Sequence, residues 1–321
     1  MVTSMMDDAE RGTGTLDALL EPFDDRFAAL VPASASLERL ATGAAWSEGP
    51  VYVPRDDCVL WSDVPNNRVL RWARGEGMSV HTAPSDFANG HTLDLDGRVV
   101  RCEHGGRRIS LVKPDGTVVT LVDRFEGRRL NSPNDVVVRS DGTIWFTDPP
   151  YGILSDREGH KAESELGVNH VFRFDPAAGE LTAVTDAVEE PNGLAFSPDE
   201  SLLYVSDTSA ALGRHEGHHH IVAFDVEDGR RLGEPRVLAV IEPGLADGFR
   251  VDVHGNLFTS AGDGVHVLAA DGTLLGKIHV PETVSNCVFG GPRRTRLFIT
   301  ATTSLYAIDV STAGASPRDL L

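Results

Sequence analysis

The stretch PNGLAFSPDE, residues 191–200, contains the pattern that decides the fold. A polar residue, usually followed by Gly or Asp, leads into a short apolar segment that ends in a turn sequence. Five further stretches share this pattern, with 39 to 58 residues between successive polar positions: SEGPVYV from Ser47, ANGHTLDLDG from Ala88, PNDVVVRSDG from Pro133, ADGFRVDVHG from Ala246 and VSNCVFGG from Val284. A unit that recurs at this period indicates a repeat architecture.

Each of the six stretches is followed by further segments that read as β-strands. The second segments are VLWSDV, RVVRCEHG, TIWFTDPPYG, LLYVSDT, LFTSAGDG and LFITATT, and third and fourth segments such as HVFRFD and LTAVTD complete the unit. Alternating apolar residues, β-branched side chains and turns such as DG indicate antiparallel strands. Four strands per unit predict an all-β, six-bladed β-propeller of four-stranded antiparallel blades over residues 36–321.

The last unit provides only three strands, because the pattern ends at SLYAIDV. We expect the segment SLERLATG, residues 36–43, to supply the missing outer strand, since closure by the N-terminal strand removes an exposed sheet edge. Residues 1–35 are then an N-terminal extension packed on the propeller, with a short helix expected within residues 16–31. Because the ring is closed, a monomer or a weak dimer is expected.

Composition narrows the functional classes. The 321 residues include 29 Lys and Arg against 48 Asp and Glu, a net charge of −19. This balance argues against nucleic acid and anionic membranes as partners. The three cysteines Cys58, Cys102 and Cys287 show no metal-ligand spacing, which favours a reducing compartment. The N-terminus lacks the pattern of a secretory signal, and no long apolar run is present, so we expect a cytoplasmic protein.

The repeat places six polar residues at one mouth of the central channel, because every first strand starts at the same face. These residues are Glu48, Asn89, Asn134, Asn192, Asp247 and Asn286. The second strands are expected to end nearby with Asp63, Glu103, Asp148, Asp207 and Asp263. Oxygen ligands without Cys or His favour Ca²⁺, then Mg²⁺ or Mn²⁺. The alternative for any single residue is a turn role, because Asn and Asp often bond their own backbone in turns.

These motifs resemble the gluconolactonase family, which includes regucalcin and luciferin-regenerating enzyme. The resemblance rests on SEGPVY, ANGHTLDLDGRVVRCEHGGRRI, SPNDVVVRSDGTIWFTDPPYG, EPNGLAFSPDESLLYVSDT and GDGVHVLAADGTLLGKI, and it runs from about Trp46 to the last strand. It implies a six-bladed propeller that holds one divalent metal, usually calcium, and hydrolyses a lactone at the channel mouth. The metal ligands it implies are Glu48, Asn134, Asn192 and Asp247.

The resemblance also makes Asp247 the expected catalytic base. The chain departs from the animal members of the family at Ser132, where those members carry an arginine that holds the sugar. The resemblance therefore supports the expected metal site more directly than it supports a particular sugar as substrate. The expected activity is the opening of D-glucono-1,5-lactone to D-gluconate. Other lactones or phosphotriesters, Zn²⁺ as the working ion, and a non-enzymatic calcium-binding propeller remain alternatives.

The repeat places a second set of residues around the mouth, where we expect them to contact substrate: Asn89, His91, Glu103, Asn134, Tyr151 and Asn286. The alternative for His91 is a histidine packed inside the first strand of the second blade. The cluster GRHEGHHH, residues 213–220, suggests a transition-metal site through His218 and His220, but a solvated loop is the favoured interpretation because no Cys or Asp completes a ligand set.

Overall fold

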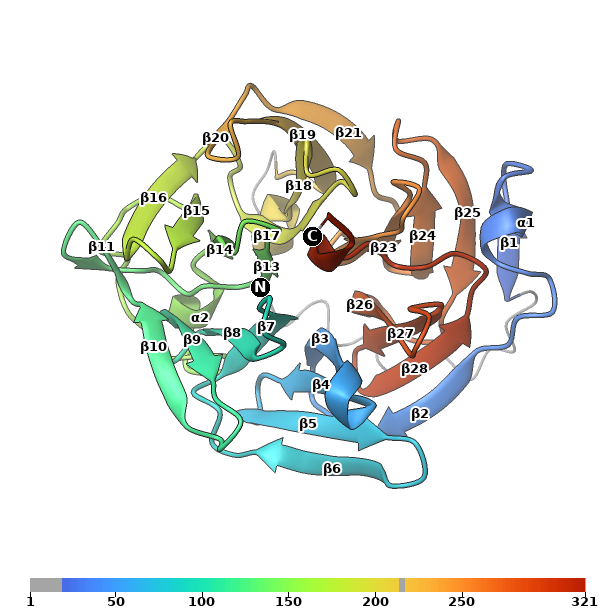
Figure 1. Cartoon of the computed structure of the whole chain (residues 1–321), viewed down its shortest axis with the longest axis horizontal. Coiled ribbons are helices and arrows are strands. Elements are labelled where there is room, and N and C mark those ends of the chain that lie inside the picture. The colour runs from blue at the N-terminus through green and yellow to red at the C-terminus, as the bar shows by residue number, and fades with distance from the viewer. Residues whose placement is uncertain (1–18, 214–216, 321) are drawn as a thin grey trace.

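A computed structural model describes residues 19–213 and 217–320. In the ribbon, six sheets stand around a central axis like the blades of a propeller (Figure 1). The predicted all-β, six-bladed architecture is confirmed. Residues 1–18 of the predicted extension, residues 214–216 of the His-rich segment and residue 321 lie outside the described part of the chain.

The first three blades follow one another along the chain, and in each the strands pair in sequence order. Blade one contains β3 (Ser47–Val53), β4 (Cys58–Asp63), β5 (Arg68–Ala73) and β6 (Gly77–Thr82). Blade two contains β7 (Ala88–Leu93), β8 (Val99–Glu103), β9 (Arg108–Val112) and β10 (Val118–Val122). A small hairpin, β11 (Arg124–Phe125) and β12 (Arg128–Arg129), leads to blade three, which contains β13 (Val136–Val138), β14 (Ile144–Asp148), β15 (His170–Asp175) and β16 (Glu180–Thr185).

The remaining blades differ from the first three at their outer edges. Blade four contains β17 (Pro191–Phe196), β18 (Leu202–Asp207), β19 (His220–Glu227), the short β20 (Arg231–Leu232) and β21 (Arg236–Val240). Blade five contains β22 (Phe249–Val251), β23 (Leu257–Ser260), β24 (Gly264–Leu268) and β25 (Leu274–His279). Blade six contains β26 (Val284–Gly290), β27 (Arg296–Ala301) and β28 (Ser304–Asp309).

The ring closes through the N-terminal segment, as the sequence predicts. Strand β2 (Glu38–Thr42) pairs antiparallel with β28, with Glu38 opposite Ala307 and Thr42 opposite Ser304. The preceding segment adds β1 (Leu20–Pro22) to the outer edge of blade five, where Leu20 lies opposite Ile278. This fifth strand was not predicted, because three residues that end in proline carry no strand periodicity.

The helix expected within residues 16–31 is one turn long, α1 (Phe27–Leu30). Its Phe27 ring is buried between blades five and six. Gly276 leaves room for this ring, since a Cβ at that position would lie 2.6 Å from it. The contact anchors the described part of the segment before β2 on the propeller.

The apolar core lies between neighbouring blades. Trp145 from blade three, for example, packs with Leu203 and Phe224 from blade four. All seven residues of β3 are buried, as expected for an inner strand that contacts blades on both sides. Burial of these inner strands holds the six blade starts at fixed positions around the axis.

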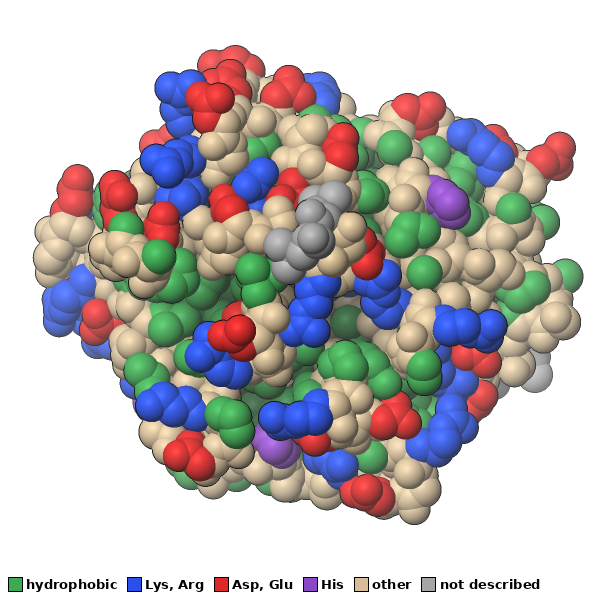
Figure 2. Space-filling model, in the orientation of Figure 1, with side chains coloured by type: hydrophobic (Ala, Val, Ile, Leu, Met, Phe, Trp, Pro, Cys, Tyr) green, Lys and Arg blue, Asp and Glu red, His purple; other side chains and the backbone are tan. Residues whose placement is uncertain are grey.

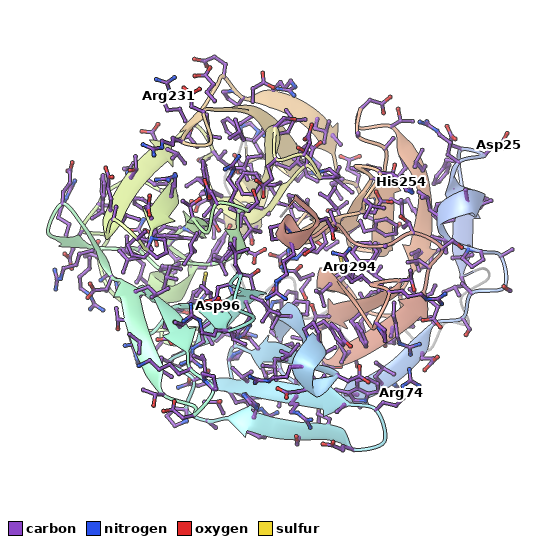
Figure 3. The ribbon with its side chains drawn as sticks, viewed as in Figure 1. Asp25, Arg74, Asp96, Arg231, His254 and Arg294 are labelled. Atoms are coloured by element: carbon purple, nitrogen blue, oxygen red, sulfur yellow. The ribbon has the colours of Figure 1, made fainter. Side chains whose placement is uncertain are left out.

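The two ends of the channel differ. The end that faces the viewer holds a cavity of about 390 Å³, crossed by the C-terminal segment with its short helix η4 (Pro317–Leu320). Figure 2 shows Lys and Arg side chains around a hollow with hydrophobic side chains in its floor. Arg294 lies near the centre of this face, whereas Asp25 and Arg231 lie at the periphery (Figure 3). The first strands begin at the opposite end.

The other short helices lie in connections: α2 (Tyr151–Leu154) follows β14, η2 (Pro54–Asp56) follows β3, and η3 (Ser209–Leu212) follows β18. None of the helices in the described residues has the length and apolar character needed to cross a membrane.

Candidate active site

Irregular pairing at the blade starts turns the polar residues out of the sheets. The register between first and second strands shifts after Glu48 in blade one, after Ala88 in blade two, after Pro191 in blade four and after Val284 in blade six. A β-bulge re-aims side chains in this way and is common next to functional sites. In blades three and five, Asn134 and Asp247 lie just ahead of the strand.

The predicted ring forms, and its amides are linked directly. Asn89 Nδ2 donates to Asn134 Oδ1 at 2.6 Å, and Asn134 Nδ2 donates to Asn192 Oδ1 at 2.5 Å. The amide of Asn192 in turn hydrogen-bonds the carboxylate of Asp247. Residues that are far apart in the sequence thus form one chain of polar contacts across blades two to five.

The two ring carboxylates carry perturbed pKa values. Burial, followed by the charges of Asp247 and Asp135, raises the pKa of Glu48 well above its usual range. Burial raises the pKa of Asp247 to about 7, against a lowering contribution from Asn192. Asn286 Nδ2 donates to Glu48 Oε2 at 3.2 Å and so brings blade six into the ring. Carboxylates this close together favour a bound cation or a retained proton.

The glycine that follows a ring residue has a packing role. A Cβ at Gly90 would lie 2.5 Å from the carbonyl oxygen of Asn134, and a Cβ at Gly193 would lie 2.5 Å from that of Asp247. The backbone amides of both glycines donate to these same oxygens at 2.8 Å. Glycine is therefore needed because adjacent blades approach through their backbones at the axis.

The aspartates at the ends of second strands are not additional mouth carboxylates, which corrects the expectation from the sequence. Three of them accept a backbone N–H located three residues before the ring residue of their own blade, at 2.7 to 3.0 Å: Asp63 from Ala45, Asp148 from Asn131 and Asp207 from Glu189. They fix the segment that enters each blade. Asp263 instead pairs with His266 and Lys277.

The serine or threonine before each of these three aspartates contacts the backbone of the ring residue in the next blade. Ser62 Oγ donates to the Asn89 carbonyl at 2.8 Å, and Thr147 Oγ1 donates to the Asn192 carbonyl at 2.7 Å. Ser206 Oγ lies 3.3 Å from the carbonyl of Asp247. The repeated Ser/Thr–Asp pair in WSD, FTD and VSD is the signal in the sequence that could have identified this supporting layer.

Glu103 and His91 are placed differently from the other predicted substrate contacts. The Glu103 carboxylate is buried and bonded to Arg101, Arg108 and Ser110, so its oxygens are engaged within blade two. His91 is buried with Nδ1 2.8 Å from the Gly49 carbonyl oxygen, and burial lowers its pKa to about 4. Its placement matches the alternative of a histidine packed in the first strand of blade two.

Tyr151 is linked to the ring through the side chain of Thr208. Its hydroxyl lies 2.5 Å from Thr208 Oγ1, and Thr208 accepts from Asn192 Nδ2 at 3.2 Å. Ser132, where the sequence analysis notes a departure from the resembled family, is buried, donates to the Pro149 carbonyl at 2.6 Å and accepts from a backbone amide of α2.

Two residues near the ring were missed by sequence reasoning. His104 is buried, with Nε2 3.2 Å from Asn89 Nδ2 and Nδ1 3.0 Å from the Glu158 carbonyl oxygen. The negative charge of Glu158 contributes to the raised pKa of Asp247. His104 directly follows Glu103 at a second-strand end, which was a usable signal, whereas Glu158 lies in a connection without repeat periodicity.

The His-rich segment is described only in part. His218 and His220 stack with ring centroids 4.6 Å apart. His219 Nδ1 lies 3.0 Å from the carbonyl oxygen of Ile241. Over the described residues, no three His, Cys, Asp or Glu side chains are grouped to hold a metal ion.

The ring offers another kind of ligand set, because it contains two carboxylates and four amides. Glu48 Oε1 and Asn89 Oδ1 are buried and have no hydrogen-bond partner among the described residues. Such buried oxygens are costly unless a proton or cation satisfies them. The residues Glu48, Asn134, Asn192 and Asp247 therefore fit a hard divalent cation with oxygen preference.

Comparison with known proteins agrees with this picture. Residues 46–303 match the model of the SMP-30/Gluconolactonase/LRE-like region. A gluconolactonase from Zymomonas mobilis is 34% identical over 94% of this chain and 88% of its own length, and a pentonolactonase from Haloferax volcanii is 30% identical over 81% and 82%. The structure of a gluconolactonase from Xanthomonas campestris superposes with a TM-score of 0.85 at 40% identity, covering 93% of this chain and 96% of that one.

The fold and the ring define a propeller hydrolase. The chain belongs to the SMP-30/gluconolactonase/LRE-like family. The predictions of this family and of a lactonase as the enzyme class are confirmed.

Proposed function

We propose that this lactonase opens a sugar lactone at the ring of polar side chains, with a divalent cation, Ca²⁺ in the first place, held by Glu48, Asn134, Asn192 and Asp247. The observation that carries the proposal is that these four residues, from four blades, are linked in one polar group in which the buried Oε1 of Glu48 has no hydrogen-bond partner among the described residues. The identity to a gluconolactonase over nearly the whole chain supports the same reaction.

A bound divalent cation supplies electrophilic stabilisation of the negative charge that develops on a carbonyl oxygen. The chain's own residues supply the geometry. The chain of amides from Asn89 to Asn192 holds its oxygens in one orientation, because each amide is fixed by its neighbour. Such preorganisation avoids the cost of reorienting dipoles during the reaction.

Asp247 is the proposed base. In the reaction, water adds to the lactone carbonyl carbon, the ring C–O bond breaks, and the ring oxygen gains a proton to give the open hydroxy acid. Asp247 accepts the proton of the attacking water, and its interactions with Asn192 and with the charge of Glu48 support its place in the ring. A general base contributes about 10²- to 10⁴-fold.

The proposed substrate is an aldonolactone, with D-glucono-1,5-lactone as the first choice. Its hydroxyl groups match the polar character of the ring and of its neighbours, which include Asn286 and the Tyr151–Thr208 pair. The names of the gluconolactonase and pentonolactonase relatives support this class of substrate.

The test is proton release from D-glucono-1,5-lactone by chelator-treated protein, with Ca²⁺, Mg²⁺, Mn²⁺ or Zn²⁺ restored singly and spontaneous opening subtracted. Turnover that depends on one of these ions supports the proposal. Ion binding without lactone opening rejects the substrate, and a panel of other lactones and phosphotriesters then becomes the assay. Full turnover without any ion rejects the role of the metal.

A further inference from the structure

The chain of ring amides ends at a buried histidine. His104 directly follows β8, and its Nε2 lies 3.2 Å from Asn89 Nδ2 and 3.2 Å from Asn134 Oδ1. The other ring nitrogen, Nδ1, lies 3.0 Å from the carbonyl oxygen of Glu158, in the connection between β14 and β15. His104 therefore joins the backbone of this connection to two of the ring residues.

The contacts of His104 select one tautomer of its imidazole. A backbone carbonyl oxygen only accepts hydrogen bonds, so Nδ1 carries the proton that is donated to Glu158. Nε2 of the neutral ring is then an acceptor, and Asn89 Nδ2 is the donor that faces it. The opposite tautomer would place the lone pair of Nδ1 against the Glu158 carbonyl oxygen, and neither atom could donate.

The two hydrogens of the Asn89 amide nitrogen have one acceptor each. Asn89 Nδ2 donates to Asn134 Oδ1 at 2.6 Å and to His104 Nε2 at 3.2 Å. The remaining polar atom, Asn89 Oδ1, is buried and has no hydrogen-bond partner among the described residues. If this amide were turned over, its oxygen would face two acceptors instead. His104 therefore fixes the orientation of the Asn89 amide.

The same polarity continues to the other end of the chain of amides. Asn134 Nδ2 donates to Asn192 Oδ1, and Asn192 Nδ2 donates to Thr208 Oγ1 at 3.2 Å. The Thr208 hydroxyl has a single hydrogen, which it donates to the Glu190 carbonyl at 3.4 Å, so it accepts from Asn192 and from the Tyr151 hydroxyl. Backbone carbonyls thus set the direction of the hydrogen bonds at both ends.

Close packing holds the His104 side chain in its place. A Cβ at Gly152, in α2, would collide with the Cβ of His104, so this helix packs directly against the histidine. The His160 amide donates to the Gly152 carbonyl at 3.0 Å and closes the same connection on itself. Because Tyr151 also lies in this connection, one segment supports the chain of amides at both ends.

We propose that His104 is a positioning residue of this lactonase, whose Nδ1–H tautomer locks the amides of Asn89 and Asn134 in the orientation with which the ring binds its cation. The inference deepens the proposed function, in which Asn134 is a ligand. An amide oxygen has two lone pairs, so Asn134 Oδ1 keeps one for a cation while it accepts from Asn89. Groups that orient ligands in this way contribute about 10- to 100-fold to metal affinity or activity.

Three substitutions separate the two nitrogens of His104. His104→Gln offers an amide oxygen close to the place of Nε2, His104→Asn offers an amide nitrogen close to the place of Nδ1, and His104→Leu offers neither. We expect Ca²⁺ affinity, measured by titration calorimetry, and kcat/KM for D-glucono-1,5-lactone to fall about 10- to 100-fold in His104→Asn and His104→Leu. His104→Gln should retain most of both quantities, because the acceptor for Asn89 is restored.

His266→Leu is the matched control for the loss of a buried histidine, since His266 Nε2 contacts Asp263 and not a ring amide. Its Ca²⁺ affinity should equal that of wild-type protein. An equal loss in this control would overturn the inference. Retention in His104→Asn with loss in His104→Gln would also overturn it, because the histidine would then act only by holding the Glu158 carbonyl. Equal losses in these two variants would reduce His104 to a packing role and would reject the proposal.

The tautomer is measured without any assay of activity. Long-range ¹H–¹⁵N correlation spectra of wild-type protein, with the His104 signals assigned by their loss in His104→Gln, distinguish a proton on Nδ1 from a proton on Nε2. A ring protonated only on Nδ1 supports the inference, and a proton on Nε2 overturns it. If wild-type protein binds Ca²⁺ but opens no lactone, the proposed substrate fails, and the tautomer and the Ca²⁺ affinities still decide the role of His104.

Discussion

Asn134 Nδ2 donates to Asn192 Oδ1 at 2.5 Å, which joins two blade starts separated by 58 residues in the chain. The backbone of Asn192 is also held by blade three, because Thr147 Oγ1 donates to the Asn192 carbonyl oxygen at 2.7 Å. Each ring residue is thus positioned by groups from a neighbouring blade. A change at one blade is therefore expected to be felt at the next one.

Thr147→Val tests this supporting layer. The substitution keeps the shape of the side chain but leaves the Asn192 carbonyl and the Asp135 amide without the Thr147 hydroxyl. We expect Ca²⁺ affinity or kcat/KM to fall about 10- to 100-fold, as for other groups that orient ligands. Metal titration calorimetry and the lactone assay measure the change. Thr259→Val is the control, since within the described part of the chain this buried hydroxyl donates only to the carbonyl of its own neighbour, Ser260. An equal loss there would contradict the prediction.

Gly193→Ala tests the close approach of blades four and five. The new Cβ would lie 2.5 Å from the Asp247 carbonyl oxygen, so the two backbones must separate. Overpacking of this kind costs about 1–3 kcal/mol of the free energy of unfolding, and it should also displace Asp247 and reduce turnover. Urea unfolding provides the measurement. Gly233→Ala is the matched control, because its nearest contact would be an ordinary 3.6 Å; equal stability of the two variants would refute the packing role.

Asp148→Asn tests whether burial raises the pKa of the Asp148 carboxylate, through the pH dependence of stability. Burial raises the pKa of Asp148 to about 7, while the backbone amides of Asn131 and Ser132 oppose the rise. An acid whose pKa is raised by folding binds more protons in the folded state. Its ionisation therefore destabilises the folded state fully above about pH 7, and this destabilisation is lost at low pH. The shift from 3.8 to about 7 corresponds to at most about 4 kcal/mol.

The variant retains one oxygen to accept from Asn131 and buries an NH₂ in place of the other oxygen, near the Ser132 amide, at a cost that does not depend on pH. We therefore expect Asp148→Asn to gain stability relative to wild-type protein as the pH rises from about 4 to 8, because only wild-type protein has the carboxylate whose pKa is raised to about 7. Thermal unfolding of both proteins across this range provides the comparison. A stability difference that does not depend on pH would show that burial does not raise the pKa of Asp148.

The number of blades and the six ring residues were predictable, because a repeat forces equivalent residues to the same end of equivalent strands. Asp63, Asp148 and Asp207 were misassigned for a related reason: strand ends share a face, but only side-chain direction separates a mouth carboxylate from one that caps the backbone of Ala45, Asn131 or Glu189. Glu158 was not predictable, since its place depends on tertiary contacts of an irregular connection with Ser132 and His104.

Glu48→Gln separates two effects of the Glu48 carboxylate, destabilisation of the metal-free protein and binding of the cation. Burial and the charges of Asp247 and Asp135 raise the pKa of Glu48, so its ionised form destabilises the metal-free protein. Glutamine keeps an oxygen for the Gly49 amide and for Asn286, and it removes the charge. In the presence of a chelator at pH 8, we expect a higher midpoint of thermal unfolding for the variant than for wild-type protein.

Adding Ca²⁺ should reverse this order, because a ligand that binds only the folded state stabilises it by about 2.7 kcal/mol at 100 times its Kd. Wild-type protein gains this stabilisation, whereas Glu48→Gln loses a charged ligand and should gain little and turn over about 10²- to 10⁴-fold more slowly. Glu180→Gln, at an exposed position of β16, is the control for the loss of one negative charge. Equal stabilisation of Glu48→Gln and wild-type protein by Ca²⁺ would place the cation elsewhere and would leave the raised pKa of Glu48 as a property of a proton-retaining ring.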